Sequence, residues 1–293
     1  MIENKARMKV LVLGATGLIG SSVFKLLSQE YETWGIARSS YAKPFFSDTL
    51  QHRLIFGIDA LNESALIRLM EDVNPDVVVN CIGLTKHLKG GDDPMMSIPI
   101  NSLLPHRLAK LCGINGSRLI HISTDCVYSG KKGGYIESDP SDSEDIYGKS
   151  KFLGEVLYPH VITLRTSTIG HELLTAYGLL NWFLSQSEQC KGFSRAIFSG
   201  LPTVEFARVI RDVVIPGGEL TGLYHVAGRP ISKYELLKMI AVEYDKSIDI
   251  LKDEQFVIDR SLNSDRFKNA TGYVAPEWPE LISQMHASYI EGE

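Results

Sequence analysis

Residues 121–155 read HISTDCVYSGKKGGYIESDPSDSEDIYGKSKFLGE, and this stretch decides how the chain is interpreted. It overlaps an apolar segment, residues 118–122, that is typical of a buried strand and leads directly into Ser123 and Thr124. After a loop rich in glycine and acidic residues, the pattern predicts a helix that contains Tyr147 and Lys151. Because these two residues are four positions apart, they share one face of that helix.

A hydroxyl, a phenol and an ammonium are therefore predicted to converge beyond the end of this strand. A neighbouring ammonium favours the phenolate and lowers the pKa of a tyrosine. A phenol tuned in this way can exchange a proton with a carbonyl oxygen near neutral pH. Any helix can carry a Tyr-x-x-x-Lys pair by chance, so this interpretation of Thr124, Tyr147 and Lys151 depends on the rest of the chain.

The start of the chain supplies the supporting motif. Residues 9–13 form a continuous apolar run, residues 14–20 read GATGLIG, and residues 21–29 have helical apolar spacing. Strand, glycine turn and helix is the context that a dinucleotide-binding motif requires, because the helix N-terminus favours a pyrophosphate. The alternative is a tight turn that binds no ligand. The residues expected to hold the cofactor here are Gly14, Thr16, Gly17, Leu18, Ile19 and Gly20.

The second predicted strand, residues 33–37, ends at Arg38 and Ser39. A cofactor without a 2′-phosphate usually meets an acidic side chain at this place, whereas a guanidinium suits a phosphate. We therefore predict NADP(H) as the preferred cofactor, with NAD(H) possible. The alternative is that Arg38 is an ordinary surface residue.

Two further strands are predicted to bring residues to the cofactor. Residues 53–58 lead to Asp59 and Ala60, and Asp59 either accepts a hydrogen bond from the adenine amine or caps the helix at residues 63–72. Residues 76–80 lead to the remaining candidates of this group, Cys81 and Gly83, and to the loop that contains Lys86. Lys86 is a candidate for binding a phosphate or a sugar hydroxyl, although a lone lysine in a loop is more often only solvated.

Composition excludes several classes of function. The chain has 293 residues, is 44% hydrophobic and carries a formal net charge of −5, so nucleic acid is an unexpected partner. Its four cysteines are widely spaced, which predicts reduced thiols in a cytoplasmic protein and no metal site. Residues 1–7 are polar, unlike a signal peptide, and no apolar run reaches the length of a membrane span.

Strands alternate with helices through the first half, which predicts an α/β fold with a doubly wound parallel sheet. Ligands of such sheets bind at the carboxyl ends of the strands. A helix is expected at residues 101–112 despite Pro105. The later expected elements are strands at 161–165, 222–226 and 255–259, helices at 173–185, 205–215 and 232–244 with Ser232 as N-cap, a turn-rich link at 198–204, and a last helix after Pro279.

These motifs together resemble the extended short-chain dehydrogenase/reductase family, and most of all its dTDP-4-dehydrorhamnose reductase branch. The matching segments are GATGLIG at 14–20, STD at 123–125, YGKSK at 147–151, LRTSTIG at 164–170 and GLYHVAG at 222–228. The resemblance implies a Rossmann-type NADP(H)-binding domain at residues 1–169. It also implies a smaller α/β substrate-binding region at residues 170–293, with some segments returning to the first domain.

The resemblance also implies roles for the convergent residues. Thr124 would hydrogen-bond the substrate carbonyl, Tyr147 would be the general acid, and Lys151 would hold the nicotinamide ribose and lower the tyrosine pKa. The implied reaction is NADPH-dependent reduction of a 4-keto-6-deoxy nucleotide-sugar in deoxysugar and surface polysaccharide biosynthesis. A homodimer is one of the assemblies to be expected. The loop at residues 84–99 departs from the branch pattern, which leaves the sugar open.

Two other functions stay open. One is a nucleotide-sugar epimerase or dehydratase that keeps NAD tightly bound, and Asp125 stands where a dehydratase carries its acidic residue. The other is a non-catalytic NADP-binding subunit, because the same superfamily includes a regulatory subunit of methionine adenosyltransferase.

Arg260 is the candidate for binding the diphosphate of the substrate, with Lys86 and Asp125 as further substrate contacts. It follows the expected strand at residues 255–259 and precedes a turn, a place from which a side chain can point into a cleft. The protein is net negative, so a local cation is expected to meet the diphosphate. The alternative is that Arg260 pairs with Asp259 or Asp265 on the surface.

Overall fold

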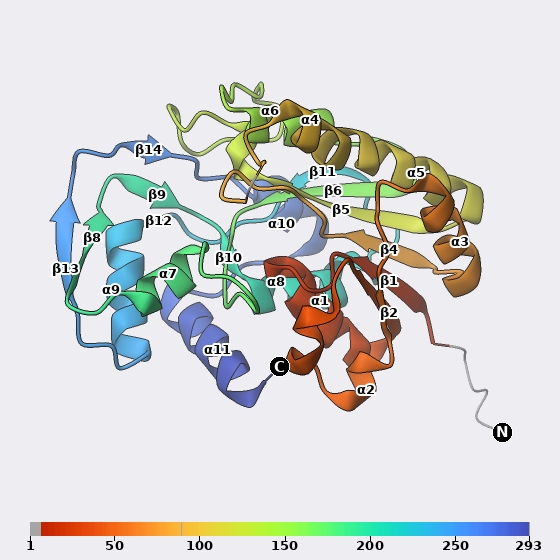
Figure 1. The fold of residues 1–293 in the computed structure, drawn as a ribbon. Coiled ribbons are helices and arrows are strands. Elements are labelled where there is room, and N and C mark those ends of the chain that lie inside the picture. Colours follow the sequence, from red (N-terminus) through yellow and green to blue (C-terminus); the bar gives the residue numbers. More distant parts are fainter. Residues whose placement is uncertain (1–6, 89, 293) are drawn as a thin grey trace.

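A seven-stranded parallel sheet forms the centre of the molecule, in a computed structural model that describes residues 7–88 and 90–292 (Figure 1). The strand order reverses on either side of β1, which pairs with both β2 and β4. This confirms the predicted doubly wound α/β fold. In spatial order the strands are β11(Gly222–His225), β6(Val161–Thr166), β5(Arg118–Thr124), β4(Val77–Asn80), β1(Lys9–Leu13), β2(Glu32–Ala37) and β3(Leu54–Phe56).

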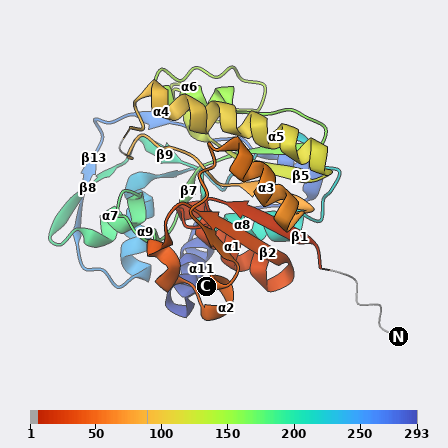
Figure 2. The same cartoon turned by 45° about the vertical axis from the view of Figure 1, so that its right-hand side comes forward.

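The continuous apolar runs form central strands because both faces of the sheet are covered. Side chains alternate along a strand, so Val10 and Val12 enter one hydrophobic cluster while Leu11 and Leu13 enter the other. Figures 1 and 2 show α3 and α5 on one face of the sheet and α1 and α8 on the other. The bounds of these helices are α1(Leu18–Glu30), α3(Glu63–Val73), α5(Leu104–Asn115) and α8(Thr203–Val209).

The later part of the chain forms smaller sheets beside the carboxyl ends of the central strands (Figure 1). Its strands are β7(Thr168–Ile169) with β10(Leu201–Pro202), β8(Gln189–Phe193) with β13(Asp249–Asp253), and β9(Ala196–Phe198) between β12(Ile231–Ser232) and β14(Ile258–Asp259). Its helical elements are α7(Leu179–Ser185), η4(Ile210–Val214), α9(Lys233–Glu243), α10(Asp265–Thr271) and α11(Trp278–Glu291). The remaining elements of the first half are η1(Ser40–Phe45), α2(Asp48–Gln51), α4(Pro94–Ser97), η2(Ile98–Leu103), η3(Asp125–Val127) and α6(Ile146–Leu153).

Several predicted bounds were wrong, each for a local reason. The helix expected at residues 173–185 begins only at Leu179, because the Glu172 carboxylate accepts hydrogen bonds from Thr175 and Gly178 and holds this segment as a loop. The strand expected at residues 53–58 ends at Phe56, since Gly57 has φ of +79° and turns the chain.

Long-range pairing explains other differences. The strand expected at residues 255–259 shrinks to β14, because only its last two residues pair with β9. The link expected at residues 198–204 contains β10 and the start of α8. β13 was missed, since its sequence DILKD mixes exposed charged and apolar residues and its order comes from pairing with β8.

Pro105 lies inside a helical stretch that runs from Pro94 to Asn115 and passes through the π-helical turn η2. The prediction of a helix at residues 101–112 is therefore confirmed, with the proline in the first turn of α5. Ser232 caps α9 as predicted, since its hydroxyl accepts a hydrogen bond from the Glu235 N–H.

The expectation about the start of the chain concerns residues 1–7, of which residues 1–6 lie outside the described residues. Across residues 7–88 and 90–292, every helix is too short or too polar to span a lipid bilayer. The division of the chain at residue 169 remains a prediction, and β11 from the later part pairs with β6 in the central sheet.

Candidate active site

Thr124 is the last residue of β5 and lies at the carboxyl edge of the sheet. The strand runs two residues further than the apolar run suggested, because Ser123 and Thr124 still pair with Arg165 and Thr166 of β6. The buried Thr124 hydroxyl accepts a hydrogen bond from the Cys126 N–H at 3.1 Å and donates one to Asp125 Oδ1 at 3.1 Å. A hydroxyl is thus held in a fixed orientation at the end of a buried strand.

Helix α6 carries Tyr147 and Lys151 on one face and begins at the N-cap Asp145, whose carboxylate accepts the Gly148 N–H at 2.7 Å. Lys151 is only 4% exposed, and its Nζ donates a hydrogen bond to the carbonyl oxygen of Ile122 at 2.6 Å. The structure therefore places the lysine beside β5, two residues before Thr124. Burial lowers the pKa of Lys151 to about 8, while the nearby Glu155 opposes this.

The pKa of Tyr147 lies above its ordinary value, mainly because of burial. The neighbouring Cys126 adds to this increase, and hydrogen bonding with Thr124 counteracts it. The net shift of this pKa is therefore upward and not downward as predicted, because the effect of burial is the largest. A phenol with a raised pKa is a protonated acid at neutral pH, which is the form a proton donor needs.

The glycine loop between β1 and α1 adopts the geometry that its sequence requires. Gly14 has φ of +76°, a conformation that favours glycine. A Cβ at Gly20 would lie 2.0 Å from the carbonyl oxygen of Gly14, so only glycine permits this approach. Gly17 is the exposed N-cap of α1. The partly exposed Thr16, Leu18 and Ile19 surround it. An accessible helix N-terminus behind a glycine turn fits the diphosphate of a dinucleotide.

The candidates for the adenosine end follow β2 and β3. Arg38 and Ser39 are exposed directly after β2, and the Ser39 hydroxyl accepts the Tyr41 N–H at 3.2 Å at the start of η1. Asp59 is exposed and accepts the Leu61 N–H at 2.9 Å, whereas Ala60 is buried. The alternative that Asp59 caps α3 was wrong, because the helix is capped by another residue, Asn62.

Past β4, the chain runs beside the lysine of α6. A Cβ at Gly83 would lie 3.9 Å from Lys151 Nζ, and burial raises the pKa of the Cys81 thiol to about 12. The buried Asn101 of η2 was missed by the sequence analysis. Its side chain exchanges hydrogen bonds with both backbone groups of Leu84 and donates one to Ser150 Oγ of α6 at 3.0 Å. A polar residue within an apolar helical stretch was the signal that could have revealed it.

Arg260 lies beside the Thr124 end of β5. Its Nε donates a hydrogen bond to the Tyr128 carbonyl oxygen at 2.8 Å, and its Nη1 approaches Cys126 Sγ at 3.4 Å. The alternative of a surface ion pair with Asp259 or Asp265 was wrong for the described residues, where those carboxylates accept hydrogen bonds from elsewhere.

Two cations, Arg260 and Lys233, act on Asp125 or respond to it, and Lys86 acts on Lys233. Burial raises the pKa of the Asp125 carboxyl, and Arg260 lowers it in part. Lys233 was missed by the sequence analysis. Its pKa is lowered mainly by burial, but it responds to Asp125 and to Lys86. Lys233 begins α9 after β12, and Arg260 follows β14, so the two strands beside β9 deliver both residues. Only the pairing of these distant segments reveals Lys233.

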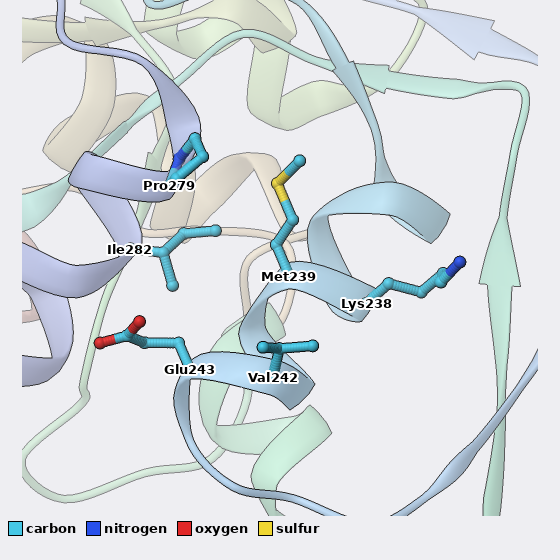
Figure 3. A pocket seen from close by; sticks show the side chains of 6 residues that line it. All are labelled: Lys238, Met239, Val242, Glu243, Pro279 and Ile282. Atoms are coloured by element: carbon cyan, nitrogen blue, oxygen red, sulfur yellow. The ribbon is translucent and has the colours of Figure 1, made fainter.

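Two cavities of the molecule are lined by residues other than Thr124, Tyr147 and Lys151. One, of about 330 Å³, opens between α9 and α11 and is lined by the six residues of Figure 3: Lys238, Met239, Val242, Glu243, Pro279 and Ile282. The second, of about 550 Å³, lies beside α1 and α11. Neither contains Thr124, Tyr147 or Lys151. Within the described residues, no group of three or more His, Cys, Asp or Glu side chains is arranged to hold a metal ion.

A protein-family model described as the RmlD substrate binding domain matches residues 8–289. The chain belongs to this family. Members of the RmlD family include the dTDP-4-dehydrorhamnose reductases, so the predicted family is confirmed.

Sequence matches to named relatives cover about half of this RmlD family member. A methionine adenosyltransferase 2 subunit beta from Danio rerio is 32% identical over 150 residues, which cover 50% of this chain and 42% of the relative. A dTDP-4-dehydrorhamnose reductase from Burkholderia thailandensis is 30% identical over 167 residues, which cover 55% of this chain and 50% of the relative. The match thus spans half or less of either relative.

The RmlD-type fold extends over nearly the whole chain. The structure of a dTDP-4-dehydrorhamnose reductase from Bacillus anthracis in complex with NADP superposes with a TM-score of 0.80. It covers 96% of this chain and 99% of that chain at 20% identity, which supports a shared fold.

Proposed function

We propose that this protein is an NADPH-dependent reductase that acts on the 4-keto group of a 4-keto-6-deoxy nucleotide-sugar. The observation that carries the proposal is the placement of Thr124, Tyr147 and Lys151 around the carboxyl end of β5. A glycine loop that fits a dinucleotide lies at the same edge of the sheet. The membership in the RmlD family supports the same reaction class.

The residues present have the chemistry that a carbonyl reduction needs. When bound, the reduced nicotinamide supplies the hydride for the carbonyl carbon. Tyr147 donates its hydroxyl proton to the carbonyl oxygen, so that an alcohol results. Thr124 Oγ hydrogen-bonds the same oxygen and orients it. Lys151 hydrogen-bonds the ribose of the cofactor, and its charge stabilises the phenolate that forms on Tyr147.

We assign the diphosphate of the substrate to the cations around Asp125. Arg260 donates to the Tyr128 carbonyl oxygen and to Cys126 Sγ, and it also acts on the Asp125 carboxyl. Lys233 responds to Asp125, and it responds to Lys86 and Arg260 as well. Arg260, Lys86 and Lys233 act on one another with a single carboxylate, Asp125, among them, which leaves an excess of positive charge in a protein whose net charge is −5. Asp125 is left as an acceptor for the sugar hydroxyls.

The cofactor preference is proposed from Arg38, which is exposed at the carboxyl end of β2 where a 2′-phosphate would lie. Ser39 and Asp59 complete this end with oxygen acceptors, and NAD(H) is the alternative cofactor. A homodimer in solution also stays a prediction.

The function is tested by a screen of 4-keto nucleotide-sugars that differ in the nucleotide, following the loss of NADPH absorbance. We expect stoichiometric oxidation of NADPH with at least one substrate. Protein that purifies with one tightly held NAD per chain and converts the sugars without net oxidation of NADPH would instead indicate an epimerase or dehydratase.

The second candidate function is that of a subunit without reductase activity, favoured by the Danio rerio relative named methionine adenosyltransferase 2 subunit beta. Size-exclusion chromatography of this protein mixed with a methionine adenosyltransferase catalytic subunit separates the two candidates. Co-elution, together with no reduction of any 4-keto sugar, would replace our proposal by this one.

A further inference from the structure

A buried ion pair lies directly behind the candidate catalytic residues. Arg165, near the end of β6, contacts the Glu155 carboxylate through one edge of its guanidinium, with Nε to Oε1 at 2.7 Å and Nη2 to Oε2 at 2.6 Å. The two side chains are 3% and 6% exposed. Two parallel hydrogen bonds fix both the position and the orientation of the Glu155 carboxylate, whereas a solvated surface ion pair fixes neither.

The same carboxylate also holds the strand that carries Thr124. The Ser123 hydroxyl donates a hydrogen bond to Glu155 Oε1 at 2.7 Å, and Ser123 is paired with Arg165 across β5 and β6. Glu155 lies two residues after the last residue of α6. One side chain therefore joins the end of α6 to the ends of two central strands.

The same carboxylate favours the protonated form of Lys151. The lysine is buried, and an ammonium without a nearby anion loses its proton more readily in such a place. The Ile122 carbonyl supplies a hydrogen bond acceptor but no full charge. Glu155 has the largest influence among the side chains that oppose the effect of burial on the pKa of Lys151, and Cys81 adds to it.

We propose that Glu155, held by Arg165 and Ser123, is a positioning residue that fixes α6 against β5 and keeps Lys151 protonated. The inference rests on the proposed roles of Tyr147 and Lys151. The network reaches the substrate side as well, because Arg165 also donates to the Tyr128 hydroxyl and the Tyr128 carbonyl accepts from Arg260. Glu155 is therefore the sharper target for a test, since a change at Arg165 would disturb both sides.

The test compares Glu155→Gln with the matched control Glu205→Gln. Glu205 is also a buried carboxylate, 8% exposed in its side chain, with an arginine at 3.7 Å and a tyrosine hydroxyl at 2.8 Å, but it lies on α8. The titration of Lys151 is followed by NMR in protein with 13C at lysine Cε, with its signal assigned by loss in Lys151→Ala. This measurement needs neither substrate nor cofactor.

We expect Glu155→Gln to lower the pKa of Lys151 by roughly one unit, the low end of the effect of a close opposite charge. Glu205→Gln should leave it unchanged. An unchanged Lys151 titration in Glu155→Gln, or equal changes in both variants, would overturn the proposal. If no sugar is reduced by the unmodified protein, the proposed function fails while this titration still decides the role of Glu155.

Activity supplies the second measurement. Because Lys151 must be protonated, kcat/KM falls as the pH rises through its pKa, and Glu155→Gln should move this fall to lower pH. Glu155→Asp keeps the charge but shortens the side chain, so we expect an unchanged Lys151 pKa with kcat reduced about tenfold or more by misplacement of α6. This variant also decides the matter if Glu155→Gln does not fold, since an unaltered kcat in Glu155→Asp would exclude the positioning role.

Discussion

Tyr147 is a partly buried residue with a pKa above its ordinary value, and hydrogen bonding with Thr124 opposes this increase. A protonated phenol at this position is suited to donate a proton, whereas the Cys81 and Cys126 thiols nearby are held protonated by burial and are poor nucleophiles. The residues proposed for the reaction are therefore one acid, Tyr147, one orienting hydroxyl, Thr124, and one cation, Lys151.

Replacing Tyr147 by Phe removes the proton donor and leaves the ring. We expect kcat to fall about 100-fold or more, the effect of losing a general acid, when NADPH oxidation is measured with saturating sugar. The matched control is Tyr273→Phe, which removes the hydroxyl of a partly buried tyrosine that donates to Glu205 on α8. Turnover of Tyr147→Phe at the level of this control would show that the proton comes from elsewhere.

Arg38→Asp replaces the guanidinium at the end of β2 by a carboxylate that repels a 2′-phosphate. We expect the ratio of kcat/KM for NADPH and NADH to shift towards NADH by roughly 1–3 kcal/mol, the scale of a charge-assisted hydrogen bond. Arg68→Asp makes the same change of charge at an exposed position of α3 and should leave the ratio unaltered. A ratio that stays the same in both variants would make Arg38 a surface residue only.

Arg260→Ala tests the binding of the diphosphate. We expect KM for the nucleotide-sugar to rise about tenfold, because one charge-assisted hydrogen bond to the diphosphate is lost, with KM for NADPH unchanged. Arg266→Ala is the control, since Arg266 is exposed and lies 4.9 Å from the ring of Tyr224. A parallel rise of both KM values, or no rise, would remove Arg260 from the substrate site.

Among the elements, the turn between β1 and α1 brings strand and helix into close contact. The carbonyl oxygen of Gly14 occupies the space that a side chain at Gly20 would need, so α1 can begin close to the strand only with glycine there. The first turn of α1 therefore lies at the edge of the sheet where β5 ends with Thr124.

Gly20→Ala should displace the start of α1. We expect a loss of about 1–3 kcal/mol in the free energy of unfolding, measured in denaturant, because a methyl group is forced into a packed site. Affinity for NADPH, measured by fluorescence titration, should fall with it. Gly218→Ala adds a methyl group where no atom lies within 4 Å and should change neither quantity. Equal stability and affinity in the two variants would contradict the role given to this turn.

For the whole molecule, local patterns predicted the central sheet and the residues at its edge. Apolar runs followed by glycine or a hydroxyl were sufficient to place Gly14 and Thr124, since these signals lie within one strand and its exit. Lys233 could not be predicted, because it reaches Asp125 only through the pairing of β12 and β14 with β9. The pKa of Tyr147 was predicted in the wrong direction, since the burial that raises it comes from tertiary packing, which a local sequence pattern does not show.

The pairing of β11 with β6 has a consequence for the order in which the molecule can assemble during synthesis. A strand from residues 222–225 completes the edge of the sheet whose other strands all lie before residue 167. While the ribosome is still making the intervening segment, β6 has an open edge with unpaired backbone groups, which is a template for pairing with another chain. The nascent chain is therefore most exposed to aggregation in the interval between the emergence of these two strands.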